Sequence, residues 1–180
     1  IVGQAFKSKK NQRIIISGGL GTMGYALPAA IGAAFAEPQK KIICLVGDGS
    51  LHTNIHELSV IEHHNLNIKI IVINNKGYAS IRNTQNAFMD GNIVASSDST
   101  GVIYPIWKKI CQSYSILHYT ASKFSELVNL LGDEFNKTGP KFFEINIPSE
   151  VELIPAVVSV KNEDGSFTSS KLNEMSPKLS

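Results

Sequence analysis

"IICLVGDGSLHTNIHELSVIEHHNLNIKIIVINN", residues 42–75, contains two apolar runs that each end in polar residues. The runs at 42–46 and 69–73 are short and rich in β-branched side chains, which predicts two buried strands. The first is followed by GDGS at 47–50 and the second by NN at 74–75. Because parallel strands place their carboxyl ends at one edge of a sheet, we expect these two polar segments to lie close together.

The same alternation of short apolar runs and helix-like segments continues along the chain. We expect further strands at 14–17, 116–119 and 141–147, and helices at 26–36, 54–64, 78–85, 106–113 and 122–136. This order predicts an α/β fold of three layers, a mainly parallel sheet with helices on both faces.

Two segments lack the spacing of apolar residues that is typical of a helix or a strand. The polar, Gly- and Ser-rich residues 88–103 predict a mobile loop. From Pro148 onward, polar residues dominate, so we expect one domain at 1–150 and an irregular tail at 151–180.

Composition excludes several classes of protein. A net charge of only +2, with lysines scattered along the chain, predicts neither a nucleic-acid partner nor a membrane surface. The uncharged run at 14–36 is long enough to span a bilayer, but its glycines and Pro28 argue against a spanning helix. Cys44 and Cys111 lie in apolar stretches and are expected to be buried, reduced thiols, which favours a cytoplasmic location.

The segment that follows the first strand carries ligand chemistry. Asp48 emerges from a buried strand between two glycines that allow close backbone approach. Carboxylate and amide oxygens are ligands for Mg²⁺, which usually shares its coordination sphere with the phosphates of a substrate. The N–H groups of Gly49 and Ser50 are suited to a phosphate. The alternative is a plain strand-to-helix turn with Asp48 as its cap.

A glycine-rich stretch upstream suggests a different ligand. Residues 16–36 contain Gly19-x-Gly21-x-x-Gly24, which has the glycine spacing of a dinucleotide-binding turn. This spacing alone is a weak indication of function. An NAD(P)-binding Rossmann domain of a dehydrogenase is therefore an alternative, with Asp48 as its acidic residue. That reading leaves the asparagines at 74–75 without a role. A non-catalytic domain that retains the fold is a third possibility.

The paired motifs at 47–50 and 74–75 resemble the signature of thiamine-diphosphate-dependent enzymes, with 24 residues from Ser50 to Ile73 between them. The upstream stretch GGLGTMGYALPAAIGAA is similar to the corresponding segment of the acetolactate synthase and pyruvate oxidase branch. The resemblance runs from about Gln12 to Ile147. It implies the thiamine-diphosphate-binding fold and the C-terminal diphosphate-binding domain of a transferase or lyase that decarboxylates a 2-oxo acid and then joins carbon fragments.

The resemblance also implies a set of site residues. Mg²⁺ would be held by Asp48, the Asn75 side chain and the main-chain oxygen of Gly77. In the glycine turn, the Gly21 carbonyl would accept from the aminopyrimidine of the cofactor, and the Met23 side chain would lie between its two rings. The expected cofactor-binding residues are Gly21, Met23, Gly47, Asp48, Gly49, Ser50, Asn75, Gly77 and Tyr78.

Family members place the glutamate that activates the pyrimidine in another domain, usually on a neighbouring subunit. We therefore expect no catalytic residue in these 180 residues, and pyrimidine-binding and middle domains elsewhere in the parent enzyme. The expected partners are a small 2-oxo acid and the pyrimidine-binding domain of a neighbouring subunit in a homodimer or homotetramer. The chain alone is expected to be inactive, and any FAD in the parent enzyme would bind outside this domain.

Some residues depart from the family pattern. Ser80 and Thr84 stand where acetolactate synthases carry a Met and a Trp, which leaves room for a more polar substrate, whereas Arg82 and Gln85 fit. His52 and His56 have the helical spacing of a zinc pair, but no third-ligand pattern follows, so zinc is not favoured.

Overall fold

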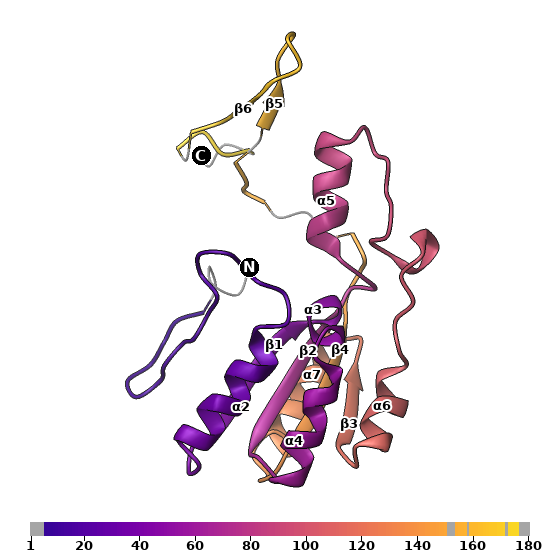
Figure 1. The fold of residues 1–180 in the computed structure, drawn as a ribbon. Helices are drawn as coiled ribbons and strands as arrows, with labels where there is room; N and C mark the ends of the chain where they lie inside the picture. The colour runs from indigo at the N-terminus through magenta and orange to yellow at the C-terminus, as the bar shows by residue number, and fades with distance from the viewer. Residues whose placement is uncertain (1–5, 151–153, 158, 172, 177–180) are drawn as a thin grey trace. The chain divides into compact units, whose positions relative to one another are not determined.

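The computed structural model describes residues 6–150, 154–157, 159–171 and 173–176 (Figure 1). These residues belong to two compact units, one of residues 13–149 and one made from the two segments that flank it. The predicted domain start at residue 1 and residues 151–153 of the predicted tail lie outside the described residues.

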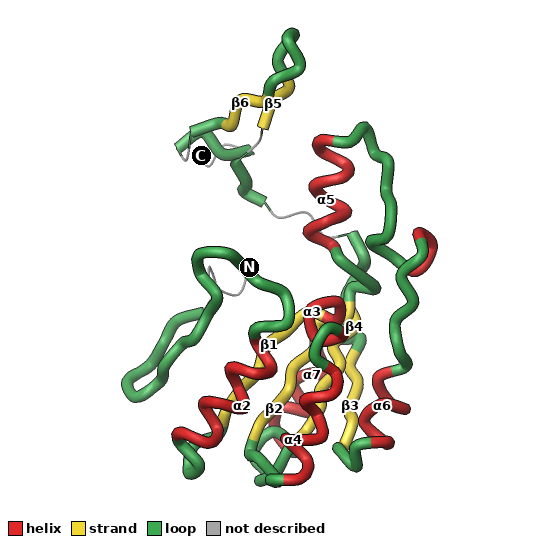
Figure 2. The backbone as a smooth tube through the Cα atoms, viewed as in Figure 1, coloured by secondary structure: helices red, strands yellow, loops and turns green. Residues whose placement is uncertain are grey.

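The larger unit is built on four parallel strands, β1 (Ile42–Gly47), β2 (Ile68–Asn74), β3 (Leu117–Ala121) and β4 (Lys141–Asn146). Their order in the sheet is β1-β2-β4-β3 (Figure 2). Gly47 of β1 pairs with Ile73 of β2, so the two strands end at the same level. The residues that follow them emerge at one edge of the sheet.

Six helices accompany the sheet: α2 (Ala26–Ala36), α3 (Asp48–His52), α4 (Leu58–His63), α5 (Ala79–Phe88), α6 (Trp107–Ser113) and α7 (Phe124–Asp133). Two single 3₁₀ turns, η1 (Ile55–Glu57) and η2 (Asp98–Thr100), lie between them.

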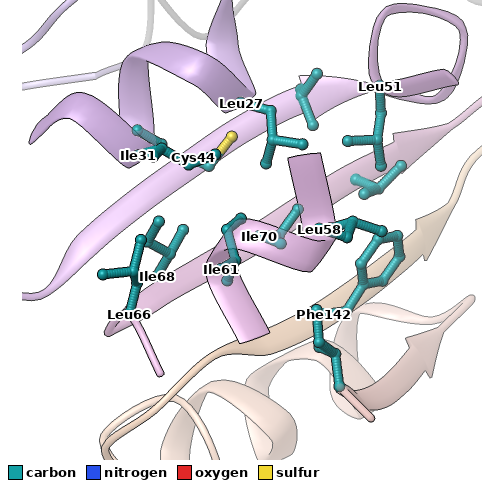
Figure 3. Close-up of a cluster of buried hydrophobic side chains, with 14 of the residues drawn as sticks. Leu27, Ile31, Cys44, Leu51, Leu58, Ile61, Leu66, Ile68, Ile70 and Phe142 are labelled. Atoms are coloured by element: carbon teal, nitrogen blue, oxygen red, sulfur yellow. The ribbon is translucent and has the colours of Figure 1, made fainter. Parts of the chain in front are cut away.

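The main hydrophobic core lies on one face of the sheet. Alternate strand residues such as Cys44, Ile70 and Phe142 meet apolar side chains of α2, α4 and α6 there (Figure 3). Leu27 of α2 and Ile61 of α4 are almost fully buried in this cluster. Each such side chain contributes roughly 1.5–3 kcal/mol by leaving water, so this face carries most of the packing energy.

On the opposite face, α7 contacts β3. Phe143 of β4 stacks on Tyr119 of β3, with ring centroids 5.3 Å apart. Phe135, just beyond α7, packs against the Phe143 ring. The parallel sheet and its two helical layers confirm the predicted fold class.

The predicted strand at 14–17 is wrong. Residues 12–17 form no regular structure, and Ile14, Ile15 and Ile16 are each about half exposed or more. A strand needs a neighbouring strand to satisfy its backbone groups, and no described strand pairs with this run. The apolar character of residues 14–17 predicted a buried strand, whereas the isoleucines at 14–16 are exposed in the structure.

Other elements differ in extent from the prediction. Helix α3 was not predicted, and α7 is shorter than the expected 122–136. The loop at 88–103 exists, but its second half contains η2 and the fully buried Ser96. In the smaller unit, strands β5 (Ser159–Lys161) and β6 (Phe167–Ser169) form an antiparallel pair within the tail expected to be irregular.

Both cysteines are free and buried, as predicted. Burial raises the pKa of each thiol to about 12. Within the described ranges, no helix has both the length and the apolar character needed to cross a bilayer.

Candidate functional site

Asp48 is the first residue of α3 and follows β1 without a loop. The residue is only 1% exposed. One oxygen accepts a hydrogen bond from the Gly49 N–H at 2.8 Å, and the other accepts from the Gly77 N–H at 3.0 Å. Burial raises the pKa of Asp48, while these N–H donors and the Arg82 guanidinium oppose the rise. The carboxylate therefore links the end of β1 to the segment after β2.

Two further oxygen-bearing groups converge on this carboxylate. One terminal atom of the Asn75 amide lies 3.1 Å from Asp48 Oδ1 and 2.7 Å from the carbonyl oxygen of Gly77. If that atom is the nitrogen, it donates to both oxygens. If it is the oxygen, three oxygens face one another with no hydrogen between them, which requires a cation.

The spacing of these three groups is that of two hydrogen bonds from the Asn75 nitrogen, and it is also compatible with metal ligands. An octahedral Mg²⁺ with ligands at about 2.1 Å places neighbouring oxygens about 3 Å apart. The two separations around Asn75 fall on either side of this value. The residue types and their spacing therefore fit Mg²⁺.

Gly77 cannot be replaced without moving the site. Its φ is +137°, and a Cβ there would lie 2.3 Å from the carbonyl oxygen of Ser96. The Tyr78 N–H donates to that same carbonyl at 2.9 Å, and Gly77 forms a β-bridge with Ser97. The second half of the long loop thus fixes the segment that follows β2.

The upstream glycine turn is tied to the same end of the sheet. The Gly24 N–H donates to the Ser50 hydroxyl at 2.9 Å, which leaves the hydroxyl proton free to be donated elsewhere. Gly24 has φ +80°, and a Cβ there would lie 2.2 Å from the Asn54 side chain. Gly21 also has positive φ, and the Met23 side chain is 49% exposed.

Tyr78 covers Gly49. A Cβ on Gly49 would lie 2.5 Å from the Tyr78 ring, so only glycine fits beneath it. The Gly49 N–H is already engaged by Asp48. Gly47, the residue before α3, has extended backbone geometry. The structure therefore brings all the predicted residues after β1 and β2 into one neighbourhood.

Arg82 is a contributor whose role the sequence did not reveal. It is 7% exposed, and its guanidinium donates to the carbonyls of Asn75 (3.2 Å), Ser96 (2.8 Å) and Ser149 (2.8 Å). Gln85, one turn further along α5, binds Val94 and Ser96. These two side chains hold the long loop and the segment after β2 together, which accounts for their burial on an otherwise polar helix.

The remaining candidates from the sequence have contacts of their own. Ser80 and Thr84 are exposed on α5, where the Thr84 hydroxyl donates to the Ser80 carbonyl. His52 packs against Tyr104, and His56 lies 3.5 Å from Glu57. Among the residues that the structure describes, no three His, Cys, Asp or Glu side chains cluster as metal ligands.

The glycine turn also departs from the dinucleotide-binding arrangement. That fingerprint follows a strand, whereas residues 12–17 form none.

The fold and site define a parallel α/β domain that presents polar loops at the carboxyl ends of adjacent strands, the place where such domains bind ligands. A sequence family described as "Thiamine pyrophosphate enzyme, C-terminal TPP binding domain" matches residues 1–145, and the chain belongs to this family.

The chain is similar to parts of longer proteins. The chain is 34% identical over 157 residues to the acetolactate synthase large subunit of Porphyra purpurea, covering 87% of this chain and 26% of that protein. It is 31% identical over 154 residues to the acetolactate synthase isozyme 1 large subunit of Escherichia coli K12, covering 86% and 27%. The chain thus spans about a quarter of the length of these relatives.

A solved structure shows the same fold. The thiamine diphosphate-dependent 4-hydroxybenzoylformate decarboxylase of Rhodococcus jostii RHA1 aligns with a TM-score of 0.63, covering 72% of this chain and 24% of that one at 22% identity. These findings confirm the family resemblance and the fold class, and they do not favour the dehydrogenase alternative.

Proposed function

We propose that this chain binds thiamine diphosphate through Mg²⁺, as the C-terminal part of an enzyme that decarboxylates a 2-oxo acid and transfers the remaining fragment to an acceptor. The observation that carries the proposal is the convergence of Asp48, Asn75 and Gly77, at spacings that suit an octahedral cation. Membership of the family supports the choice of cofactor.

Each residue has a separate task in this proposal. Asp48 supplies the charged metal ligand, and Asn75 and the Gly77 carbonyl supply neutral ones. Ser50 has a hydroxyl proton to donate to the diphosphate, and the Gly49 N–H becomes available once Asp48 turns to the metal. The remaining metal positions are left to diphosphate oxygens and water.

The glycine turn is proposed to receive the organic part of the cofactor. Met23 presents a half-exposed, flexible side chain, and Gly21 leaves its surroundings open, with no heavy atom near a Cβ placed there. When bound, thiamine diphosphate supplies a carbon nucleophile and the electron sink that decarboxylation needs. This chain's residues position it and supply no acid for its activation.

The rest of the active enzyme is proposed to lie outside this chain. The exposed residues Ile14, Ile15, Ile16, Leu20 and Met23 form an apolar segment suited to the pyrimidine-binding domain of a neighbouring subunit. We also propose that the parent enzyme is a homodimer or homotetramer, and that it is cytoplasmic, which the two reduced, buried cysteines support. The exposed Ser80 and Thr84 hydroxyls favour a more polar substrate than that of acetolactate synthase.

Thermal unfolding tests the proposal directly. A ligand that binds only the folded chain stabilises it by about 2.7 kcal/mol when present at 100 times its dissociation constant. We expect the midpoint to rise with thiamine diphosphate plus Mg²⁺, and to rise far less when EDTA replaces Mg²⁺. NAD serves as the comparison ligand. A rise with NAD and none with thiamine diphosphate and Mg²⁺ would contradict the proposal.

A further inference from the structure

Tyr104 lies between η2 and α6, and its hydroxyl is buried. Within the described ranges, it is the one buried side-chain oxygen or nitrogen with no hydrogen-bond partner. Buried polar groups in folded proteins are almost always satisfied, so an exception calls for a specific cause. A phenylalanine at this position would fill nearly the same space without that cost.

The surroundings of Tyr104 connect it to the proposed metal site. Its ring lies 6.0 Å from the Tyr78 ring and 5.7 Å from the His52 ring, measured between centroids. Tyr78 in turn covers Gly49, whose N–H is bound to Asp48. Tyr104 therefore packs beside two aromatic side chains, Tyr78 and His52, that border the segment after β1.

The groups that affect the pKa of Tyr104 include residues of the proposed metal site. Burial raises the pKa of Tyr104 well above its ordinary value. The charges of Tyr78 and Asp48 and a polar contact with the Tyr78 side chain add to the rise, and Arg82 opposes it. The contact with Tyr78 does not reach the geometry of a hydrogen bond. The phenol is therefore neutral and has a proton to donate. The nearby Asp48 carboxylate already accepts from Gly77 and Gly49, and it does not accept from Tyr104.

We propose that the Tyr104 hydroxyl is a further ligand-binding group of this site, donating a hydrogen bond to an oxygen of the bound Mg²⁺–diphosphate complex. The inference rests on the proposed function. The proposal requires the side chain of Tyr78 or His52 to move, so that the buried hydroxyl meets the ligand. The unsatisfied donor is then a feature of the ligand-free chain that binding relieves, so it contributes more to the bound state than to the free one.

Tyr104→Phe tests the inference because two readouts move in opposite directions. Without ligand, the variant loses an unsatisfied donor, and its unfolding midpoint rises by about 2–4 °C. The dissociation constant for thiamine diphosphate in the presence of Mg²⁺, measured by calorimetry, increases about fivefold or more. A purely structural tyrosine would change stability and leave the affinity unaltered.

Tyr119→Phe is the matched control. The Tyr119 hydroxyl is satisfied by Glu134 at 2.7 Å on the opposite face of the sheet, so this variant loses stability and keeps its affinity. Equal affinities of the wild type and Tyr104→Phe would overturn the inference, as would a ligand-free Tyr104→Phe chain no more stable than the wild type. Failure of the proposed function is a separate result, since the wild type itself would then not bind.

Discussion

Glu144 shows how single residues connect the site to the sheet. It lies on β4 between β2 and β3, and its carboxylate accepts from the Asn74 amide at 2.6 Å. The other oxygen lies 2.8 Å from His118 Nε2. The contact with His118 lowers the pKa of Glu144, and Asn74 adds to that effect against the opposing influence of burial. Asn74 directly precedes the proposed ligand Asn75, so this cluster supports the end of β2.

We predict that Glu144→Gln destabilises the chain by about 1–2 kcal/mol near neutral pH, because a charge-assisted hydrogen bond is lost. A carboxyl whose pKa is lowered by folding stabilises the fold above its unfolded pKa, and that stabilisation disappears as the pH falls through the folded value. The difference between wild type and variant should therefore shrink below about pH 4.5, the unshifted pKa.

Chemical unfolding of both proteins between pH 3 and pH 7 checks this prediction. Glu62→Gln, at an exposed position on α4, is the control for loss of a carboxylate. A Glu144→Gln difference that does not vary with pH would show that the pair contributes no charge-dependent stability.

The sequence predicted some of these residues and not others, for physical reasons. Asp48 and Asn75 could be found because a carboxylate and an amide directly after buried strands are costly unless they bind something. Glu144 and His118 could not, because only the β2-β4-β3 register brings them together. Tyr104 gave no signal, because an isolated tyrosine in a loop has no periodic pattern.

At the level of elements, the strands were predictable because uninterrupted β-branched runs have few other structures open to them. Helix α3 was missed because five residues are too few to show a helical period. The run at 14–17 was misjudged because strand formation depends on a partner that its own residues do not specify.

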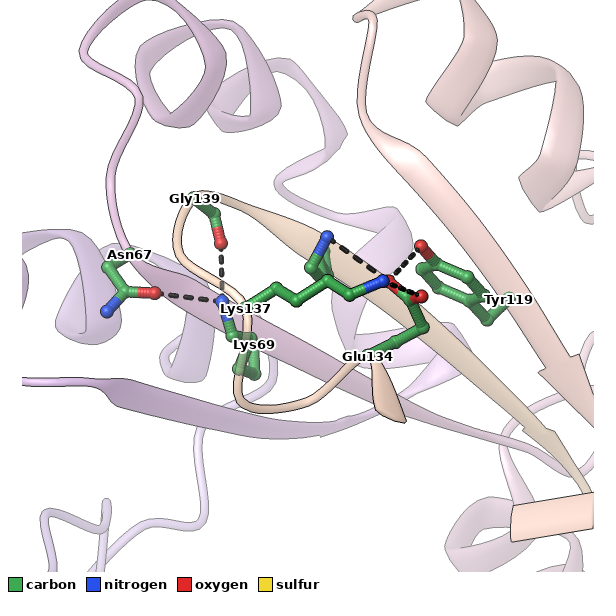
Figure 4. Close-up of polar contacts among 7 residues, drawn as sticks. Asn67, Lys69, Tyr119, Glu134, Lys137 and Gly139 are labelled. Carbon is green, nitrogen blue, oxygen red and sulfur yellow. Dashed lines mark hydrogen bonds and ion pairs between the residues drawn. The ribbon is translucent and has the colours of Figure 1, made fainter. Parts of the chain in front are cut away.

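Strand β2 contains a residue that its apolar pattern does not explain. Lys69 is fully buried, and its ammonium group donates to Asn67 at 2.8 Å and to the Gly139 carbonyl at 2.5 Å (Figure 4). Burial, together with the charges of Lys141 and Lys41, lowers the pKa of Lys69 to about 8. A turn before β4 is thus fastened to the start of β2 at an electrostatic cost.

The lowered pKa of Lys69 makes the free energy of unfolding depend on pH. Because the folded pKa of about 8 lies below the ordinary 10.5, the unfolded chain binds the proton more tightly between these values. The contribution of Lys69 to stability therefore rises with pH across this window, by at most about 1.4 kcal/mol per pH unit.

Lys69→Met should remove this rise. The quantity to measure is the free energy of unfolding at pH 7.5 and at pH 9.5, for the wild type, for Lys69→Met and for the exposed α6 variant Lys108→Met. We expect the wild type to gain stability relative to Lys69→Met at the higher pH, and to gain none relative to Lys108→Met. A constant difference between wild type and Lys69→Met would mean that Lys69 keeps an ordinary pKa.

At the scale of the molecule, the two ends of the sheet differ in chemistry. The amino end of β2 is fastened by Lys69, whereas the carboxyl ends of β1 and β2 carry the acidic and amide groups of the proposed site. The parallel strands thus present loops that bring the proposed ligands together from separate parts of the chain. The chain spans about a quarter of its relatives, so the proposed enzyme requires further domains to complete its chemistry.

Calorimetric titration of thiamine diphosphate, with and without Mg²⁺, tests the central claim most directly. The account predicts that the wild type binds in the presence of Mg²⁺, and that Asp48→Ala weakens binding at least tenfold while its circular dichroism stays that of the folded chain. Asp133→Ala, which removes the same charge from an exposed position at the end of α7, should bind as the wild type does. Equal binding by the wild type and Asp48→Ala would contradict the assignment of this site.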